Sequence, residues 1–381
     1  MSKPVPIAEY LDTLKTLGYD FRLNMCNDVI EVNGERINDI LFRTVRARMR
    51  QEGYGSSDAI QDAYTMSAAQ NKYHPVREYL TSLRWDGEAH IEKLASFFTD
   101  SYTMFPYWIR RWLIGAVGKA MTGTQNFMLV LDGEQGIGKS VFAEWLATNI
   151  KQYFCNEQIR PDEKDCQALL ISKWVWEVPE LGATIRRADT EALKAFISKM
   201  WVDIRHPYER YSIYKQPLAN FVGTVNNDSG ILTDKTGNRR FIISHLESID
   251  WAYAKECDID QVWAEAYDAF CSGKTGNLDN GEEAMANTIA DEYKLPDAIE
   301  DILWDVYEIC PDGVAAPFVY SSEIIKKVQD AGYRGTTDAI AMRVASILRT
   351  YKVKREQRRV CGTVRRGYVG IRERLASIGT P

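Results

Sequence analysis

The chain has 381 residues, of which 45% are hydrophobic and 26% are charged, and its formal net charge is −6. This balance is typical of a globular protein large enough for two or three domains, and it excludes a uniformly basic nucleic-acid coat protein. Seven dispersed cysteines beside four histidines predict reduced thiols and no zinc site. No apolar run approaches the roughly 18–20 residues that cross a bilayer. The first residues lack the apolar core of a signal peptide, so we expect a cytoplasmic protein without a membrane partner.

Residues 1–75 predict a small N-terminal α/β unit. Periodicity indicates helices over 7–19 and 37–54, and Asn33-Gly34 predicts the turn of a hairpin between them. The role of this unit stays open.

The next segment, 74–98, predicts helices that lead toward a core. Pro75 stands at a helix start and Asp86-Gly87 breaks the periodic pattern. Another helix is expected over 106–122, directly before an apolar strand that ends at Asp132.

A glycine-rich turn follows that strand and matches the phosphate-loop pattern G-x-x-x-x-G-K-[ST]. Its backbone N–H groups are expected to hold a nucleotide phosphate, because glycine leaves room for close approach. Lys139 would reach the β- and γ-phosphates of ATP, and the Ser140 hydroxyl would ligate Mg²⁺. The expected nucleotide-binding residues are Gly133, Glu134, Gln135, Gly136, Ile137, Gly138, Lys139 and Ser140.

Four more strands are expected after the loop, near 152–158, 169–178, 218–226 and 239–246. Their alternation with helices predicts a three-layer α/β core over residues 76–272, with a mostly parallel five-stranded sheet.

Polar residues at the strand ends are the catalytic candidates. Glu177 and Glu180 end one strand, and we expect one to hold Mg²⁺ and the other to orient water, with the assignment open. Asn226 ends another strand, where it would sense the γ-phosphate or serve only as a turn former. Arg239 and Arg240 precede the last strand as candidate arginine fingers.

The segment 194–215 interleaves cations with tyrosines, a pattern that suits a single-stranded backbone with stacking bases. Packing of the tyrosines against the core is the alternative. The DNA-binding candidates here are Lys199, Arg205, Arg210 and Lys215.

The C-terminal residues 285–381 follow a Gly/Asn-rich linker at 272–284. Helices over 300–310, 321–333 and 336–351 precede two strands that turn near Cys361-Gly362, which predicts a winged-helix-like domain. Residues 343–374 contain eleven Lys or Arg and two acids, so the hairpin is either a DNA-binding wing or a solvated surface. The DNA-contact candidates are Lys354, Arg358, Arg359, Arg365 and Arg366.

An ordered set of motifs resembles the virulence-associated E family of phage, plasmid and genomic-island replication proteins. That family is similar to superfamily 3 helicases within the AAA+ class. The matching stretches cover roughly 70–245 and are HPVREYLTSLRWDG, LVLDGEQGIGKS, KWVWEVPEL, ADTEALKAFIS, DIRHPYERY, FVGTVNN and DKTGNRRF.

The resemblance implies an ATP-dependent DNA helicase that forms a ring, a hexamer, in the host cytoplasm, with active sites between subunits. Lys139 and Ser140 fall on the family's nucleotide motif, and Glu177 and Glu180 on its acidic motif. Asn226 falls on its sensor, Arg239 and Arg240 on the fingers from the adjacent subunit, and 194–215 on the pore elements. The viral relatives often have two adjacent acids, where this chain has Glu-Val-Pro-Glu. Many relatives carry a primase domain, which residues 1–75 are too short to form, so a separate primase or polymerase is implied. The alternatives are an ATP-switched initiator or loader that does not unwind DNA, a motor on another track, and a nucleotide-dependent structural protein.

Overall fold

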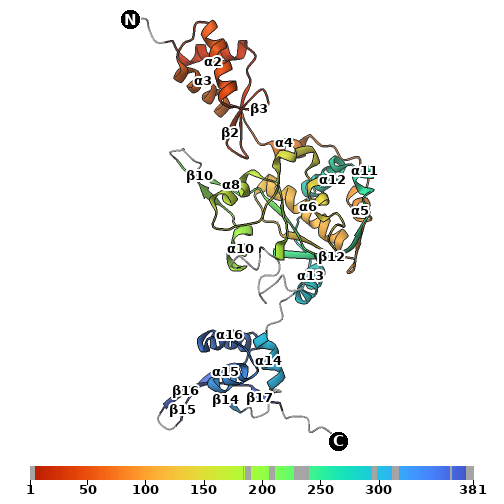
Figure 1. Ribbon diagram of the computed structural model, residues 1–381. Helices are drawn as coiled ribbons and strands as arrows, with labels where there is room; N and C mark the ends of the chain where they lie inside the picture. Colours follow the sequence, from red (N-terminus) through yellow and green to blue (C-terminus); the bar gives the residue numbers. More distant parts are fainter. Residues whose placement is uncertain are drawn as a thin grey trace. The chain divides into compact units, whose positions relative to one another are not determined.

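The computed structural model describes residues 5–182, 184, 190–205, 211–226, 240–293, 298–310, 317–360 and 363–374. The chain forms two compact units, Met1–Lys294 and Leu295–Pro381 (Figure 1). The three-part domain division expected from the sequence stays a prediction. Within the described ranges, no helix has both the length and the apolar character that a membrane crossing requires.

The N-terminal part of the first unit has a hydrophobic cluster of its own, formed by residues between Tyr10 and Ala68. Its sheet has the order β3-β2-β1-β4. The predicted hairpin is confirmed between β2 and β3, where Asn33 and Gly34 both have positive φ, +50° and +83°. The elements are α1 (Ile7–Thr16), β1 (Phe21–Asn24), β2 (Val29–Val32), β3 (Glu35–Arg36), α2 (Asp39–Gln51), α3 (Ser57–Gln70) and β4 (Lys72–Tyr73).

A six-stranded sheet forms the centre of the first unit, in the order β5-β12-β6-β11-β8-β7. The five strands from β12 to β7 pair in parallel and are the five expected from the sequence. The sixth, β5, pairs antiparallel with β12, so the expected five-stranded sheet is corrected to six. Its first residue, Phe98, ends the segment 74–98 that was expected to be helical, and no strand was expected at the other two. The strands are β5 (Phe98–Asp100), β6 (Met128–Asp132), β7 (Phe154–Asn156), β8 (Val175–Val178), β11 (Asn220–Thr224) and β12 (Phe241–Ile249).

Helices cover both faces of this sheet. Neighbouring residues of a strand point to opposite faces. In β8, the Trp176 ring packs 6.0 Å from that of Phe196 in α10, whereas Glu177 accepts a hydrogen bond from Ser140 in α7. The fold is therefore α/β with a sheet between helices. The other elements are α4 (Pro75–Ser82), α5 (His90–Ala95), α6 (Phe105–Thr122), α7 (Lys139–Trp145), η1 (Thr148–Tyr153), α8 (Lys164–Ser172), α10 (Thr190–Ile197), β9 (Val202–Ile204), β10 (Ile213–Lys215), α11 (Tyr253–Glu256), α12 (Ile259–Cys271) and α13 (Asn280–Glu292).

Fully buried tryptophans join the helices to the sheet. Each donates its indole N–H to a backbone carbonyl of another element or loop, which satisfies the one polar atom of the side chain. The bonds run from Trp108 to Ile243, from Trp112 to Phe221, from Trp174 to Ala116, from Trp176 to Glu157 and from Trp263 to Leu146.

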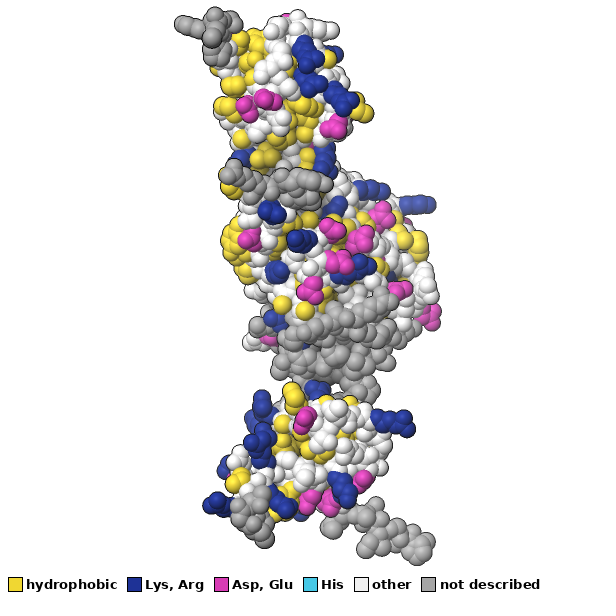
Figure 2. Space-filling view, turned by 60° about the vertical axis from the view of Figure 1, so that its left-hand side comes forward, with side chains coloured by type: hydrophobic (Ala, Val, Ile, Leu, Met, Phe, Trp, Pro, Cys, Tyr) yellow, Lys and Arg dark blue, Asp and Glu magenta, His cyan; other side chains and the backbone are white. Residues whose placement is uncertain are grey.

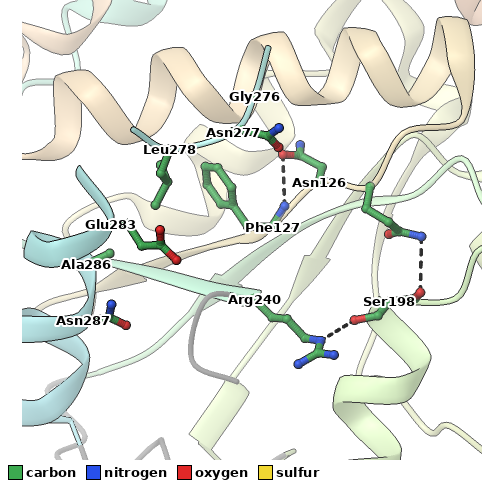
Figure 3. Close-up of a pocket in the computed structure, with 11 residues that line it drawn as sticks. Asn126, Phe127, Ser198, Arg240, Gly276, Asn277, Leu278, Glu283, Ala286 and Asn287 are labelled. Atoms are coloured by element: carbon green, nitrogen blue, oxygen red, sulfur yellow. Dashed lines mark hydrogen bonds between the residues drawn. The ribbon is translucent and has the colours of Figure 1, made fainter. Parts of the chain in front are cut away.

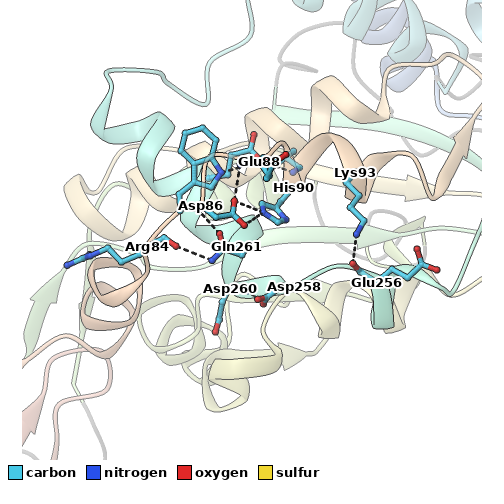
Figure 4. Close-up of polar contacts among 12 residues, drawn as sticks. Arg84, Asp86, Glu88, His90, Lys93, Glu256, Asp258, Asp260 and Gln261 are labelled. Carbon is cyan, nitrogen blue, oxygen red and sulfur yellow. Dashed lines mark hydrogen bonds and ion pairs between the residues drawn. The ribbon is translucent and has the colours of Figure 1, made fainter.

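The loop between α4 and α5 is anchored on α12 (Figure 4). Pro75 occupies the first turn of α4 and Gly87 has φ +94°. This confirms the predicted helix start at Pro75 and the predicted break at Asp86-Gly87. The Asp86 N–H donates to Gln261 Oε1 at 3.1 Å, and His90 Nε2 lies 2.8 Å from Asp86 Oδ1. Hydrogen bonds from the Glu88 backbone and from His90 lower the pKa of Asp86.

The second unit packs three helices and short sheets around its own hydrophobic cluster. Its first helix ends at Val306 rather than at the expected Cys310, because Tyr307–Ile309 pairs with β17. The predicted basic hairpin is formed by β15 and β16; its expected turn at Cys361-Gly362 lies outside the described residues. The elements are α14 (Ala298–Val306), β13 (Tyr307–Ile309), β14 (Phe318–Tyr320), α15 (Ser321–Asp330), α16 (Thr337–Thr350), β15 (Lys354–Val360), β16 (Thr363–Val369) and β17 (Ile371–Glu373).

Candidate functional site

The predicted phosphate loop, residues 133–140, connects the fully buried strand β6 to α7. Gly133 has φ +141° and Gly138 has φ +108°, conformations that residues with a side chain rarely adopt. A Cβ on Gly133 would lie 2.3 Å from the Leu246 carbonyl oxygen of β12. Glycine is therefore required for the loop to pass the end of this neighbouring strand.

Lys139 points into the loop rather than into solvent. Its side chain is buried, with the residue 5% exposed, and Nζ donates to the carbonyl oxygens of Gly133 at 2.7 Å and Glu134 at 2.6 Å. Burial lowers the pKa of Lys139, and the charge of Asp132 opposes that shift. The loop thus holds an ammonium group among its own backbone groups, where an anionic ligand would meet it.

Glu177 lies inside the sheet layer beside the phosphate loop. Its carboxylate accepts hydrogen bonds from Asn156 Nδ2 at 2.8 Å and from Thr224 Oγ1 at 3.2 Å, and it is also bonded to Ser140. Burial raises the pKa of Glu177, the bonds from Ser140 and Thr224 lower it, and the charge of Glu144 raises it. The structure therefore brings Ser140 and Glu177 together, as the sequence predicted.

Glu180 and Asn226 lie at the edge of the sheet where the parallel strands end, here called the carboxyl edge. Glu180 is exposed and has φ +48°, an uncommon conformation for a residue with a side chain. Asn226 is exposed and follows Val225, whose N–H donates to the Leu131 carbonyl of β6 at 3.0 Å. Both side chains therefore lie on the same edge as the phosphate loop, with Glu177 deeper in the sheet.

A buried polar group that the sequence did not suggest closes the end of β6. Asp132 is 2% exposed, and its Oδ2 accepts from the Tyr293 hydroxyl at 2.6 Å and lies 2.8 Å from His245 Nδ1. Burial and the Asp132 charge raise the pKa of Tyr293. Tyr293 directly follows α13, so this contact attaches the end of that helix to β6.

Arg240 lies on the opposite edge of the sheet, the amino edge. Phe241 pairs with Met128 and His245 with Asp132, so Arg240 stands a full strand length, about 16 Å, from the phosphate loop. Its Nε donates to Ser198 Oγ at 2.6 Å. A pocket of about 470 Å³ opens here and does not coincide with the phosphate loop (Figure 3). Arg239, the other finger candidate, lies outside the described residues.

Ser140, Glu177 and Glu180 fit Mg²⁺ by the nature of their donor atoms. Mg²⁺ binds oxygen and usually takes only one or two protein ligands beside substrate phosphates. Ser140 and Glu177 present such oxygens in contact with each other. A cluster of three or more His, Cys, Asp or Glu side chains able to hold a metal alone does not occur in the described ranges.

The β9–β10 hairpin exposes aromatic rings beside its cations. Trp201 and Tyr214 stack with centroids 4.8 Å apart and planes 5° apart, and both are exposed, as is Tyr211. The tyrosines at 211 and 214 are thus not packed into the core, and Trp201 was missed. Among the predicted cations, Arg205 is exposed, Lys199 donates to Gln167, Lys215 pairs with Asp28, and Arg210 lies outside the described residues.

The β15–β16 hairpin places like charges opposite each other. Arg358 pairs across the strands with Arg365, an unfavourable arrangement of like charges that the Glu356 carboxylate, 3.5 Å from the Arg358 guanidinium, partly offsets. Arg358 lies over the Phe318 ring at 4.5 Å and Arg365 over the Tyr320 ring at 5.6 Å. Figure 2 shows Lys and Arg side chains on this unit, and the five predicted contact residues, Lys354, Arg358, Arg359, Arg365 and Arg366, are all exposed.

Residues 80–295 match a family model described as the virulence-associated protein E-like domain. No curated protein matches the chain. Among solved structures, the apo structure of the NrS-1 C-terminal region (305–718) is similar with a TM-score of 0.55 at 14% identity, over 97% of this chain and 100% of that one. Two structures titled as the A form of the same apo region give TM-scores of 0.52 at 14% and 15% identity. They cover 95% of this chain and 98% and 99% of theirs. At such identity the likeness concerns the fold.

Proposed function

Because this chain belongs to the virulence-associated protein E-like family, we propose that it is an ATP-dependent DNA helicase in the replication of a phage or another mobile element. The observation on which this rests is the contact of Ser140 with Glu177 beside a phosphate loop that holds Lys139. In the proposed P-loop AAA+ core, ATP binds along residues 133–140.

The polar groups at the carboxyl edge support a hydrolytic role. The Ser140 hydroxyl and Glu177 are suited to hold Mg²⁺, which supplies charge neutralisation at the phosphates. Glu180, exposed at the same edge, is suited to orient the attacking water, and Asn226 to contact the γ-phosphate. The difference in burial supports this division: the buried acid is proposed to bind the metal and the exposed one to orient water.

The position of Arg240 supports active sites that are shared between subunits. An arginine about 16 Å from its own phosphate loop is too distant to stabilise the charge that develops there. It would serve a neighbouring subunit if the chains form a closed ring, which we propose to be a hexamer. Arg239 is proposed for the same role.

Two basic elements support DNA as the substrate. Stacked aromatic rings beside Arg205 on the β9–β10 hairpin suit the bases of a single strand in the pore. The opposed arginines of the β15–β16 hairpin suit a duplex backbone, as in a winged-helix-like domain. Primer synthesis would come from a separate primase or polymerase in the same cytoplasm.

The test is ATP turnover with and without single-stranded DNA, beside strand displacement on a forked duplex. Lys139→Ala should abolish both activities, because it removes the ammonium group from the loop. Lys151→Ala is the matched control, since its side chain is 66% exposed and, among the described residues, its ion pair is with Glu144 at 3.8 Å. Turnover that is insensitive to single-stranded DNA, without displacement, would favour the alternative, an ATP-switched initiator or loader. Absence of turnover in the wild-type protein would refute the proposal.

A further inference from the structure

Trp251 lies against the last glycine of the phosphate loop. A Cβ built on Gly138 would be 3.0 Å from Trp251 Cζ2 and 3.1 Å from Cε2. The edge of the indole therefore touches the backbone from which Lys139 and α7 begin. This tryptophan follows β12, the neighbour of β6 on the side away from β11.

The backbone on both sides of Trp251 is fixed. The Asp250 N–H donates to the Phe97 carbonyl at 2.8 Å, and Asp250 Oδ1 accepts from the Ala252 N–H at 2.9 Å. Tyr253 is 1% exposed and packs against Phe142 of α7, with ring centroids 5.7 Å apart. The backbone that carries the indole is thus held in place by its neighbours and by the helix that follows the phosphate loop.

The exposure of Trp251 sets it apart from the core tryptophans. The residue is 54% exposed, and its indole N–H forms no hydrogen bond with any residue in the described ranges. Single exposed apolar residues are common on protein surfaces, so exposure alone has no meaning. Here the exposed ring stands on a hydrogen-bonded backbone and approaches the last glycine of the proposed phosphate loop.

The polar groups of the site determine which end of a nucleotide reaches this ring. Glu177 lies in β8, and Asn226 follows β11 at its carboxyl end. Both strands are on the same side of β6 in the sheet. These groups suit the terminal phosphate and its metal ion. The nucleoside end then extends toward the other side of β6, where β12 leads to Trp251.

We propose that Trp251 is the residue that binds the base of the nucleotide, by stacking its indole on the ring face. The inference rests on the proposed ATP site and adds the contact that distinguishes a nucleotide from a bare polyphosphate. Stacking on an aromatic ring tolerates any base, because every base has a π face. Trp251 therefore adds affinity for the nucleoside, and it does not select adenine by itself.

The test is calorimetric binding of ADP and of tripolyphosphate, each with Mg²⁺, to the full chain and two variants. Trp251→Leu keeps an apolar side chain without a ring face, and Trp251→Phe keeps a smaller ring. We expect Trp251→Leu to weaken ADP binding about tenfold and Trp251→Phe to weaken it less. Tripolyphosphate should bind all three proteins alike.

Four outcomes are distinguishable. An equal loss for both ligands would show that Trp251 only shapes the loop, and an unchanged ADP affinity would exclude stacking; either result overturns the inference. Equal affinity of the wild-type protein for tripolyphosphate and ADP would also overturn it, while leaving the phosphate site intact. A wild-type protein that binds neither ligand would refute the proposed function itself.

Discussion

Asn226 and Arg240 lie on opposite edges of one parallel sheet. Asn226 follows the carboxyl end of β11, and Arg240 precedes the amino end of β12, while both strands pair in parallel with β6. A polar group on the carboxyl edge lies on the same side of the sheet as the chain's own phosphate loop. A cation on the amino edge, such as Arg240, lies away from that loop and is available to a molecule that binds this side of the unit.

Mixed rings test this division. Arg240→Ala and Lys139→Ala should each abolish ATP turnover when present alone. Co-expression of the two variants should restore part of the activity, because a junction between the intact Lys139 of one subunit and the intact Arg240 of the next is complete. In an equal random mixture this holds for roughly a quarter of the junctions. Full activity of Arg240→Ala alone, or no recovery in the mixture, would contradict a shared site.

The two acids of the site should respond differently to the loss of charge. Glu180→Gln should keep stability within about 0.5 kcal/mol, because the side chain is exposed, and should reduce turnover while nucleotide still binds. Glu177→Gln should also impair turnover, by removing the anionic metal ligand. Turnover and nucleotide binding are measured for both variants, and loss of nucleotide binding by Glu180→Gln would argue against its role with water.

Glu177 should also make stability depend on pH. Because burial raises its pKa in the folded protein, the native state holds the proton more tightly than the unfolded state. This contribution is fully present below the unfolded pKa, about 4.3, and is lost as pH rises through the raised folded pKa. The thermal midpoint of the wild-type protein should therefore fall relative to that of Glu177→Gln as pH rises from 4. A difference that is constant with pH would contradict the buried carboxyl.

The opposed arginines of the second unit predict a salt-dependent affinity. Arg358→Ala or Arg365→Ala should weaken binding of duplex DNA and reduce the slope of log affinity against log salt by about 1. Arg372→Ala is the control, because Arg372 lies in β17, outside this hairpin, and its Nε donates to Glu308 at 2.6 Å. Equal effects of all three substitutions would indicate a general charge effect rather than a binding surface at this hairpin.

The buried bond between Tyr293 and Asp132 predicts a stability effect at the end of the first unit. Tyr293→Phe removes a donor from a buried carboxylate and should cost about 1–3 kcal/mol. Tyr253→Phe is the control, because Tyr253 is also a buried residue, 1% exposed, and its hydroxyl forms no hydrogen bond within the described ranges. Urea unfolding of both variants gives the comparison, and equal effects would mean that the bond to Asp132 adds little.

Local sequence predicted the parts of this fold that depend on local pattern. The five parallel strands, the Asn33-Gly34 turn and the Pro75 helix start follow from apolar runs and turn chemistry. The strand β5 was missed because its three residues become a strand only through pairing with the distant β12. The helix expected to reach Cys310 ends early for the same reason.

The candidate site shows the same limit. The phosphate loop is a contiguous motif, so its residues could be named from the sequence. The different burial of Glu177 and Glu180 depends on which neighbouring strands each acid contacts. The two acids are only three residues apart, so their positions in the sequence do not reveal this difference. The contact of Asp132 with Tyr293 joins residues 161 positions apart, and Trp251 is a lone aromatic residue in a turn. Neither the contact between Asp132 and Tyr293 nor the position of Trp251 can be recognised from the neighbouring sequence.

The buried indoles also limit how the first unit can move. Their N–H bonds tie α6 to β11 and β12, and α12 to the end of α7, so sliding any of these elements would leave a buried indole N–H without an acceptor. Amide hydrogens in this region should therefore exchange only when the whole unit opens. If ATP hydrolysis drives a conformational change, these bonded elements would move together as one rigid body, and the hinges would lie outside them.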